Sequence, residues 1–350
     1  MTDYALLVLP AANRVYADAT SRLLRNELAV LGRAGIDAEL RELGETRIGG
    51  VDYVTFSTSS PLTPDDLAVL SNASAAYALF EVIDVAGHGR MLRPVPLTPQ
   101  DRFASDLLTI QKYSGKTNEL FTRLLVNLTC MALAEPRAML SGGLRLLDPL
   151  CGRGTTLNQA MMYGFDATGV EVDGKDYEAY ERFIKTWLRT KRFKHTAETG
   201  VLRKQKQRLG QRLDVTYAPT KEQFKAGEVN TLSYRGTDTL TVDELFPPRS
   251  FDLIVTDAPY GVQHGSHREA GLARSPRDLL AAAVPVWLRV LRPGGALGIS
   301  WNVRVLPRAE LADILRDAGL DVRDGPPFDG FAHRVDNAIE RDLITASLPR

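Results

Sequence analysis

Short apolar runs alternate with helical segments through the second half of this 350-residue chain, and that rhythm restricts the possible folds most strongly. Expected strands cover residues 144–148, 168–172, 231–234, 251–256 and 296–301, and expected helices cover 155–163, 175–188, 276–291 and 308–318. Strands that alternate with helices form a mostly parallel sheet covered on both faces. The final stretch, 331–347, has no crossover helix, which predicts a hairpin at the sheet edge. We therefore predict an α/β fold with a Rossmann-like, doubly wound sheet.

The first hundred residues show a shorter version of the same alternation. Apolar runs at 4–9 and 51–56 flank a helical pattern at 17–32, which predicts a smaller N-terminal α/β domain over residues 1–100. Three prolines between residues 93 and 99 break the pattern, as a linker does. A long helical stretch is then expected over 107–139, opening a second domain over 107–350.

Composition narrows the class of protein. The 43 basic and 43 acidic residues cancel, so no global charge attracts the molecule to nucleic acid or to a membrane. No apolar run is long enough to span a bilayer. Two cysteines, Cys130 and Cys151, do not make a disulfide framework, and the first residues lack the pattern of a signal peptide. We expect a cytoplasmic protein with no membrane partner.

A glycine-containing loop follows the first strand of the second domain. It reads Asp-Pro-Leu-Cys-Gly-Arg-Gly-Thr over 148–155, and Gly152 and Gly154 allow a sharp turn and close approach to a ligand. It is neither the three-glycine dinucleotide fingerprint nor a phosphate loop. Asp148 would repel a pyrophosphate but suits a sulfonium or an ammonium cation.

Two further acids follow later strands. Glu171 ends the second strand, where an acid accepts hydrogen bonds from ribose hydroxyls, and Asp238 follows the third, where it can accept from an adenine amino group. Together these residues fit S-adenosylmethionine better than NAD. Taken one at a time, these residues also have structural explanations. The glycines can be turn residues, Asp238 can be an ordinary helix cap, and Cys151 can be a small packing residue.

The stretch Asp257-Ala258-Pro259-Tyr260 directly follows a buried strand. A conjugated exocyclic amine is a poor nucleophile because its lone pair is delocalised into the ring. The carboxylate of Asp257 and the carbonyl of Ala258 can accept its two N–H bonds, while Tyr260 stacks on the ring. These four residues are the predicted catalytic set.

Three segments, 112–119, 148–155 and 257–262, resemble class I S-adenosylmethionine-dependent amino-methyltransferases. More narrowly, the sequence is similar to the tRNA guanosine-N2 methyltransferases that modify position ten, a similarity that Gly261 and Gly265 strengthen. The resemblance implies S-adenosylmethionine as cofactor and tRNA as partner. It departs from the family at Ala258, where a second proline is usual. The residues expected to hold the cofactor are Lys116, Thr117, Asp148, Pro149, Cys151, Gly152, Gly154, Thr155, Glu171 and Asp238.

A basic insertion is expected over residues 189–230, between the second helix and the third strand. Its first half holds nine basic residues against one acid, Glu198; they are Arg189, Lys191, Arg192, Lys194, Arg203, Lys204, Lys206, Arg208 and Arg212. Such a tract can follow RNA phosphates, or it can be a solvated loop. By position, the N-terminal domain takes the place of the RNA-binding region of the family.

Two other functions stay open at this stage. The acid-Pro-Tyr loop serves equally well in DNA adenine-N6 or cytosine-N4 methyltransferases, and a catalytically silent RNA-binding protein can keep the same fold. The cysteines and histidines, with His264 and His267 among them, lack metal-ligand spacing. The sequence leaves open the oligomeric state and the need for a small activator subunit.

Overall fold

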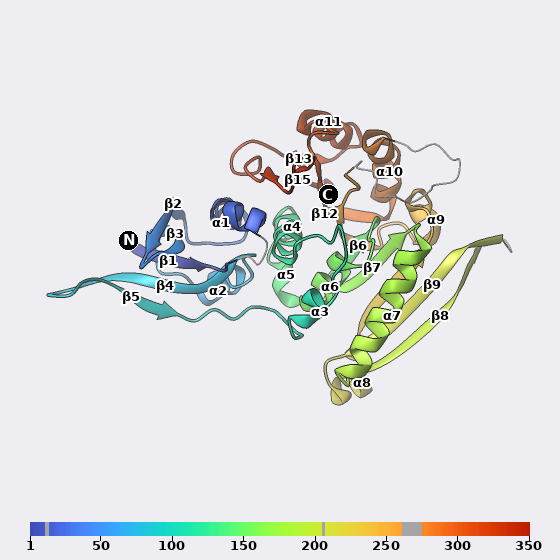
Figure 1. Cartoon of the computed structure of the whole chain (residues 1–350), viewed down its shortest axis with the longest axis horizontal. Coiled ribbons are helices and arrows are strands. Elements are labelled where there is room, and N and C mark those ends of the chain that lie inside the picture. The colour runs from blue at the N-terminus through green and yellow to red at the C-terminus, as the bar shows by residue number, and fades with distance from the viewer. Residues whose placement is uncertain (11–13, 205–206, 261–274) are drawn as a thin grey trace.

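The computed structural model describes residues 1–10, 14–204, 207–260 and 275–350, which form two sheets (Figure 1). The N-terminal sheet is antiparallel, in the order β2-β3-β1-β4-β5, with two helices beside it. Its elements are β1 (Thr2–Val8), α1 (Arg14–Ala34), β2 (Leu40–Ile48), β3 (Val51–Thr58), α2 (Pro64–Leu70), β4 (Ala76–Val85) and β5 (Gly89–Val95). Within the described residues, no helix is long and apolar enough to cross a bilayer.

The C-terminal sheet is built on five parallel strands in the order β10-β7-β6-β11-β12. Numbered along the chain, these strands lie in the order 3-2-1-4-5 that defines doubly wound nucleotide-binding folds. The fold predicted from the sequence is therefore confirmed. Its parallel strands are β6 (Arg145–Asp148), β7 (Asp166–Glu171), β10 (Asn230–Gly236), β11 (Phe251–Asp257) and β12 (Leu291–Asn302).

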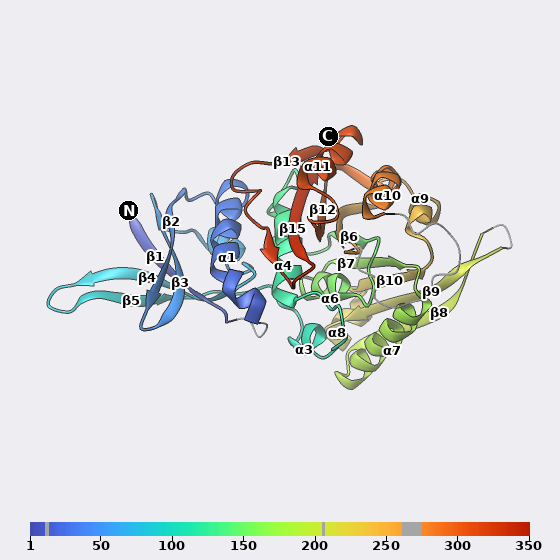
Figure 2. The same ribbon diagram turned by 45° about the horizontal axis from the view of Figure 1, so that its top comes forward.

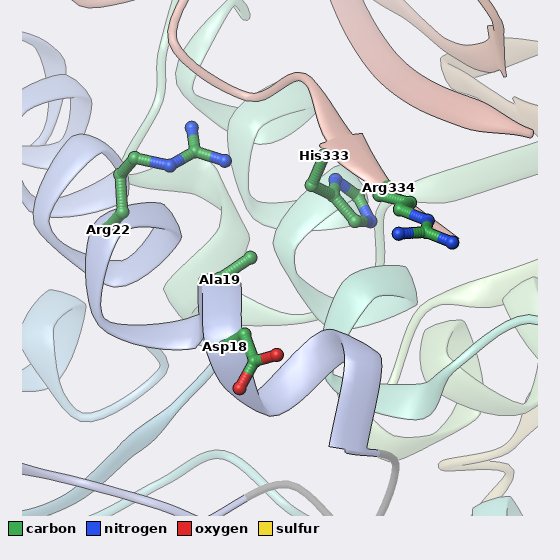
Figure 3. A pocket seen from close by; sticks show the side chains of 5 residues that line it. All are labelled: Asp18, Ala19, Arg22, His333 and Arg334. Carbon is green, nitrogen blue, oxygen red and sulfur yellow. The ribbon is translucent and has the colours of Figure 1, made fainter. Parts of the chain in front are cut away.

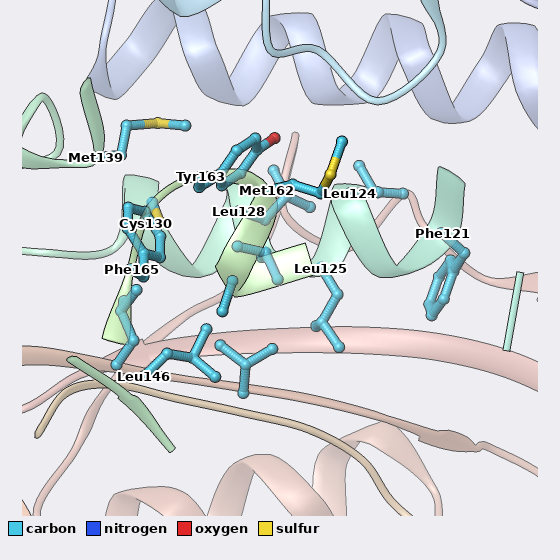
Figure 4. Close-up of a cluster of buried hydrophobic side chains, with 14 of the residues drawn as sticks. Phe121, Leu124, Leu125, Leu128, Cys130, Met139, Leu146, Met162, Tyr163 and Phe165 are labelled. Atoms are coloured by element: carbon cyan, nitrogen blue, oxygen red, sulfur yellow. The ribbon is translucent and has the colours of Figure 1, made fainter. Parts of the chain in front are cut away.

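Helices cover both faces of this sheet. One face packs against α4 (Glu119–Met131), α6 (Thr155–Met162) and α7 (Gly174–Thr190), and the other against α9 (Val242–Leu245), α10 (Pro276–Val290) and α11 (Arg308–Asp317). Figure 4 shows α4 between the strands and α1, with Leu125 directed to the sheet and Leu124 away from it. The two halves of the chain therefore share one hydrophobic core.

The basic insertion forms a long antiparallel hairpin, β8 (Lys194–Lys204) and β9 (Gln207–Ala218), followed by the short helix α8 (Lys221–Ala226). Strand β9 pairs with β10, so the hairpin extends the sheet at one edge (Figure 2). Gly236, the last residue of β10, pairs with Gln211, and the strands continue beyond this pair. The hairpin tip therefore projects past the edge where the parallel strands end.

One prediction about an element was wrong. The helix expected over 107–139 is three helices, α3 (Asp106–Thr109), α4 and α5 (Ala138–Ser141). It breaks at Gly115, whose φ is +81°, and restarts at Asn118, whose side chain caps α4 through the backbone N–H of Leu120 and Phe121.

The hairpin predicted at the sheet edge is confirmed as β14 (His333–Arg334) and β15 (Glu340–Ser347). Strand β15 pairs with β12 on one side and with β13 (Asp321–Arg323) and β14 on the other, so β13 and β14 both lie at the edge.

Candidate active site

The glycine loop lies at the carboxyl end of β6, where ligands bind in doubly wound folds. Gly152 and Gly154 have φ values of +47° and +75°, which glycine adopts without strain. A side-chain carbon at Gly152 would meet no described atom within 4 Å, whereas one at Gly154 would lie 2.3 Å from the Tyr180 ring. Gly152 thus leaves room for a ligand, and Gly154 permits packing of the loop on α7.

Asp148, the acid that begins this loop, is deeply buried. It is 2% exposed and accepts the backbone N–H of Leu150 at 3.2 Å. Burial raises its pKa to about 7, and the nearby charge of Asp257 adds to the rise, while the hydroxyls of Thr256 and Thr156 counter it. A buried carboxylate is stabilised by a nearby cation, so Asp148 in its charged form can accommodate the positive end of S-adenosylmethionine.

Glu171 and the loop touch directly. The two carboxylate oxygens of Glu171 accept the backbone N–H of Gly152 at 3.1 Å and of Asp173 at 2.9 Å. Each oxygen has a second lone pair, which leaves acceptors for ribose hydroxyls. Burial raises the pKa of Glu171, and these backbone hydrogen bonds oppose the rise.

The remaining predicted cofactor residues have mixed surroundings. Asp238 is exposed and accepts the backbone N–H of Leu240, so it caps a short helical turn, Thr239–Thr241. Pro149 and Cys151 are buried, and burial raises the pKa of the Cys151 thiol well above its usual value. That thiol is therefore a packing group. Thr155 begins α6 and its hydroxyl lies 3.2 Å from the Tyr113 hydroxyl.

Residues 257–260, called the acceptor loop below, begin at Asp257 and lie at the same edge of the sheet as the glycine loop. The Asp257 carboxylate accepts hydrogen bonds from three hydroxyls: Thr117, Ser300 and Tyr260, the last at 2.7 and 2.8 Å to the two oxygens. Ser300 lies beside Asp257 because the β11–β12 register pairs them. The carboxylate is thus fixed in position by groups from three separate segments of the chain.

The next three residues of the loop differ in exposure. Ala258 is buried and its N–H donates to the carbonyl of Ser300 at 2.8 Å, while Pro259 is exposed. The Tyr260 ring faces the Arg341 guanidinium, whose central carbon lies 5.1 Å from the ring centre. Gly261 and Gly265, together with His264, His267 and Arg268, lie outside the described residues.

The 112–119 segment contacts both loops, with Tyr113 against the glycine loop and Thr117 against the acceptor loop. Thr117, expected to bind the cofactor, donates its hydroxyl to Asp257. Lys116 is paired with Glu119 and donates to the carbonyl of Leu108 at 2.6 Å, so its ammonium group holds the segment together. We infer that Thr117 supports the acceptor side and that Lys116 is structural.

Sequence reasoning missed four residues of the site. Tyr113 contacts the glycine loop, where the Arg153 guanidinium lies 4.7 Å from its ring centre. Ser300 and Arg341 complete the surroundings of Asp257 and Tyr260. The β11–β12 register brings Ser300 to Asp257, and no local sequence pattern marks Ser300 or Arg341. Among the described residues, no group of three or more acidic, histidine or cysteine side chains is arranged to hold a metal ion.

Comparison with known proteins agrees with this geometry. The family model UPF0020, described as an RMKL-like methyltransferase domain, matches residues 131–273. That segment contains the glycine loop, Glu171 and the acceptor loop. The chain therefore carries a methyltransferase domain on a Rossmann-like, doubly wound sheet.

Solved structures of low sequence identity were also matched. TrmN from Thermus thermophilus is 12% identical, with 99% of this chain and 100% of that chain covered and a TM-score of 0.46. A TehB-like S-adenosylmethionine-dependent methyltransferase from Corynebacterium glutamicum is 16% identical, with 61% and 84% covered and a TM-score of 0.34. The comparison with curated proteins found no match.

Proposed function

We propose that this protein transfers the methyl group of S-adenosylmethionine to an exocyclic amine of a nucleobase in RNA, with guanosine N2 in tRNA as the target. The carrying observation is the position of Asp257. Its carboxylate, fixed by three hydroxyls, lies at the same sheet edge as Asp148 and Glu171. The similarity of segments 112–119, 148–155 and 257–262 to the position-ten tRNA methyltransferases supports the choice of substrate.

Asp257 orients and deprotonates the amine in this proposal. When bound, S-adenosylmethionine supplies an electrophilic methyl carbon, and the carbon–sulfur bond breaks as the amine nitrogen attacks. The incoming amine takes the place of the Tyr260 hydroxyl as donor to Asp257, because that hydroxyl occupies both carboxylate oxygens. The carbonyl of Ala258 accepts the second N–H, and Asp257 receives the proton at or after transfer. Thr117 and Ser300 keep the carboxylate aligned throughout.

Tyr260 changes partners in the same event. Once its hydroxyl has left the Asp257 carboxylate, the Tyr260 ring can stack on the target base, while Arg341 covers the other face of the ring. The target base must leave its stack to reach this loop, and an unpaired base does so at least cost.

The basic hairpin supplies a surface for the remainder of the RNA. Arg203 and Arg208 pair across β8 and β9 at the tip, and both are exposed. The tip projects past the strand ends that carry the acceptor loop, so its charges can contact phosphates beside a bound base.

Methyl incorporation from labelled S-adenosylmethionine tests the mechanism. Asp257→Ala should lose roughly a hundredfold or more in activity on tRNA while still binding the cofactor, because positioned acid–base groups contribute about that much. The control Asp313→Asn alters an exposed carboxylate on α11 and should leave activity unchanged. Full activity in Asp257→Ala would contradict the mechanism.

Tyr260 variants separate stacking from hydrogen bonding. Tyr260→Phe keeps the ring and frees the carboxylate, so most activity should remain, whereas Tyr260→Ala should lose roughly five- to hundredfold, about the worth of one base-stacking contact.

Nucleoside mass spectrometry on tRNA from cells with and without the gene tests the substrate. Loss of N2-methylguanosine is expected, and incorporation into DNA alone would favour the DNA enzyme instead.

A further inference from the structure

A pocket of about 330 Å³ opens between the N-terminal helix α1 and the β14 strand. Its lining comes from both halves of the chain (Figure 3), and the residues are Asp18, Ala19, Arg22, His333 and Arg334. Ligand pockets in proteins begin at about this volume. None of these residues belongs to the glycine loop or the acceptor loop.

His333 is a buried polar group whose second nitrogen lacks a partner. The side chain is 5% exposed, and Nδ1 lies 2.9 Å from the carbonyl of Phe331. A carbonyl only accepts, so Nδ1 carries the proton and Nε2 is left as an acceptor. Nε2 has no hydrogen-bond partner among the described residues. Leaving such a group unpaired is costly, which indicates that a ligand completes it.

Burial keeps the imidazole neutral at physiological pH. It lowers the pKa of His333 to about 4, and the nearby charges of Arg341 and Arg22 lower it further. The Nε2 atom therefore requires a hydrogen-bond donor from the ligand, such as a hydroxyl or an amine.

The charges around His333 select a ligand with both a donor and an anionic group. Arg22 donates to the carbonyls of Gly330 and Ala332 at 2.7 Å each, and three of its five N–H groups have no partner in the described part of the chain. Arg334 is exposed and is held by hydrogen bonds to Asp336 and Asn337. The Asp18 carboxylate accepts hydrogen bonds, so the pocket favours a ligand that also carries donors. A nucleotide has such donors on its base and ribose, and a free phosphate has no such groups.

The Arg341 side chain connects the pocket to the acceptor loop. His333 pairs with Arg341 across β14 and β15, and Arg341 faces the Tyr260 ring. An RNA strand whose target base stacks on Tyr260 thus has a neighbouring nucleotide within reach of the pocket.

We propose that this pocket binds a ribonucleotide beside the target base, with His333 Nε2 accepting from its 2′-hydroxyl and Arg22 and Arg334 facing its phosphate. The inference rests on the proposed RNA substrate. It gives the enzyme a means to distinguish RNA from DNA, because the 2′-hydroxyl is the group that differs.

Two substitutions at His333 test the Nε2 contact. Asparagine places its amide nitrogen near Nδ1 and keeps the bond to Phe331 but has no acceptor at Nε2, whereas glutamine places an acceptor near Nε2. The affinities of an unmodified tRNA transcript and of single-stranded DNA of the same sequence are compared without cofactor. We expect the preference for RNA to fall two- to tenfold in His333→Asn, roughly the worth of one hydrogen bond, and to persist in His333→Gln.

Arg334→Gln should weaken RNA and DNA binding alike, since phosphate contacts do not read the sugar. Arg316→Gln, an exposed arginine on α11, is the matched control. An unchanged preference for RNA in His333→Asn, with wild-type methyl transfer to RNA intact, would overturn the pocket alone. If the wild type transfers no methyl group to RNA while His333→Asn still loses the preference, the pocket stands and the proposed reaction fails.

Discussion

Asp148 links cofactor binding to protonation. With its pKa raised to about 7 by burial, the carboxyl group is largely protonated below neutral pH, and a bound cation must expel that proton. The affinity for S-adenosylmethionine should therefore weaken as pH falls below 7, by up to about tenfold per unit, and level off above it. Isothermal titration between pH 5.5 and 8.5 measures this dependence.

Variants assign the effect to one group. Asp148→Asn should bind more weakly, with most of the pH dependence gone, whereas Asp84→Asn, an exposed acid in the N-terminal half, should behave as the wild type. Glu171→Gln measures the contribution of the second acid, because its pKa is raised as well. A pH dependence that survives in Asp148→Asn would show that another group controls binding.

The residues that could be predicted are those whose roles depend on local order. Asp148, Glu171 and Asp257 each follow an apolar run, so the parallel sheet brings them to one edge. Thr117 and His333 could not be assigned, because their neighbours in space are distant in sequence. Thr117 contacts a residue 140 positions away.

At the scale of elements, the hairpin changes the interpretation of the basic insertion. As a loop, its charges would form one cluster. As two paired strands, they separate: Lys194 pairs with Ala218 at one end, whereas Arg203 pairs with Arg208 at the tip. The alternation of Leu213, Val215 and Tyr217 with polar residues already carried a strand pattern, which the basic residues obscured.

Only the tip of the hairpin should therefore bind RNA. Replacing Arg203 and Arg208 with glutamine should weaken RNA affinity and reduce the slope of log affinity against log salt by roughly 1.5, since each lost phosphate contact removes about 0.7 to 0.9. Fluorescence anisotropy at several salt concentrations measures both effects.

The control makes the same charge change at the opposite end. Arg189 and Lys194, both exposed, are replaced with glutamine, and the salt slope should stay near that of the wild type. Equal losses in the two double variants would instead indicate a general response to net charge.

At the scale of the whole molecule, the two sheets are joined by a buried polar network within the shared core. Glu27 of α1 is fully buried and accepts from the Ser74 backbone at 2.9 Å and from Asn127 of α4 at 2.7 Å. Asn127 also accepts from the Tyr163 hydroxyl at 2.7 Å. The sequence boundary near residue 100 therefore separates two sheets without separating two cores.

Glu27→Ala should destabilise both halves together. Removing the carboxylate leaves the Ser74 N–H and one N–H of the Asn127 amide buried without an acceptor, at an expected cost of about 2–4 kcal/mol in the free energy of unfolding. Burial raises the pKa of Glu27 above its ordinary value of 4.5, so its stabilising effect is greatest below that pH and declines as pH rises towards the raised value. The wild type should unfold in one cooperative transition. Urea unfolding of wild type and variant between pH 4.5 and 8 measures both the loss and its pH dependence.

Glu45→Ala is the matched control in the same half of the chain. Glu45 pairs with Arg25 at the surface, where the side chains are each 37% exposed, and its loss should cost less than about 1 kcal/mol. A Glu27→Ala variant as stable as Glu45→Ala would show that the network does not join the two sheets. Two separate unfolding transitions in the wild type would have the same meaning, because a shared core requires the N-terminal sheet and the methyltransferase sheet to unfold as one unit.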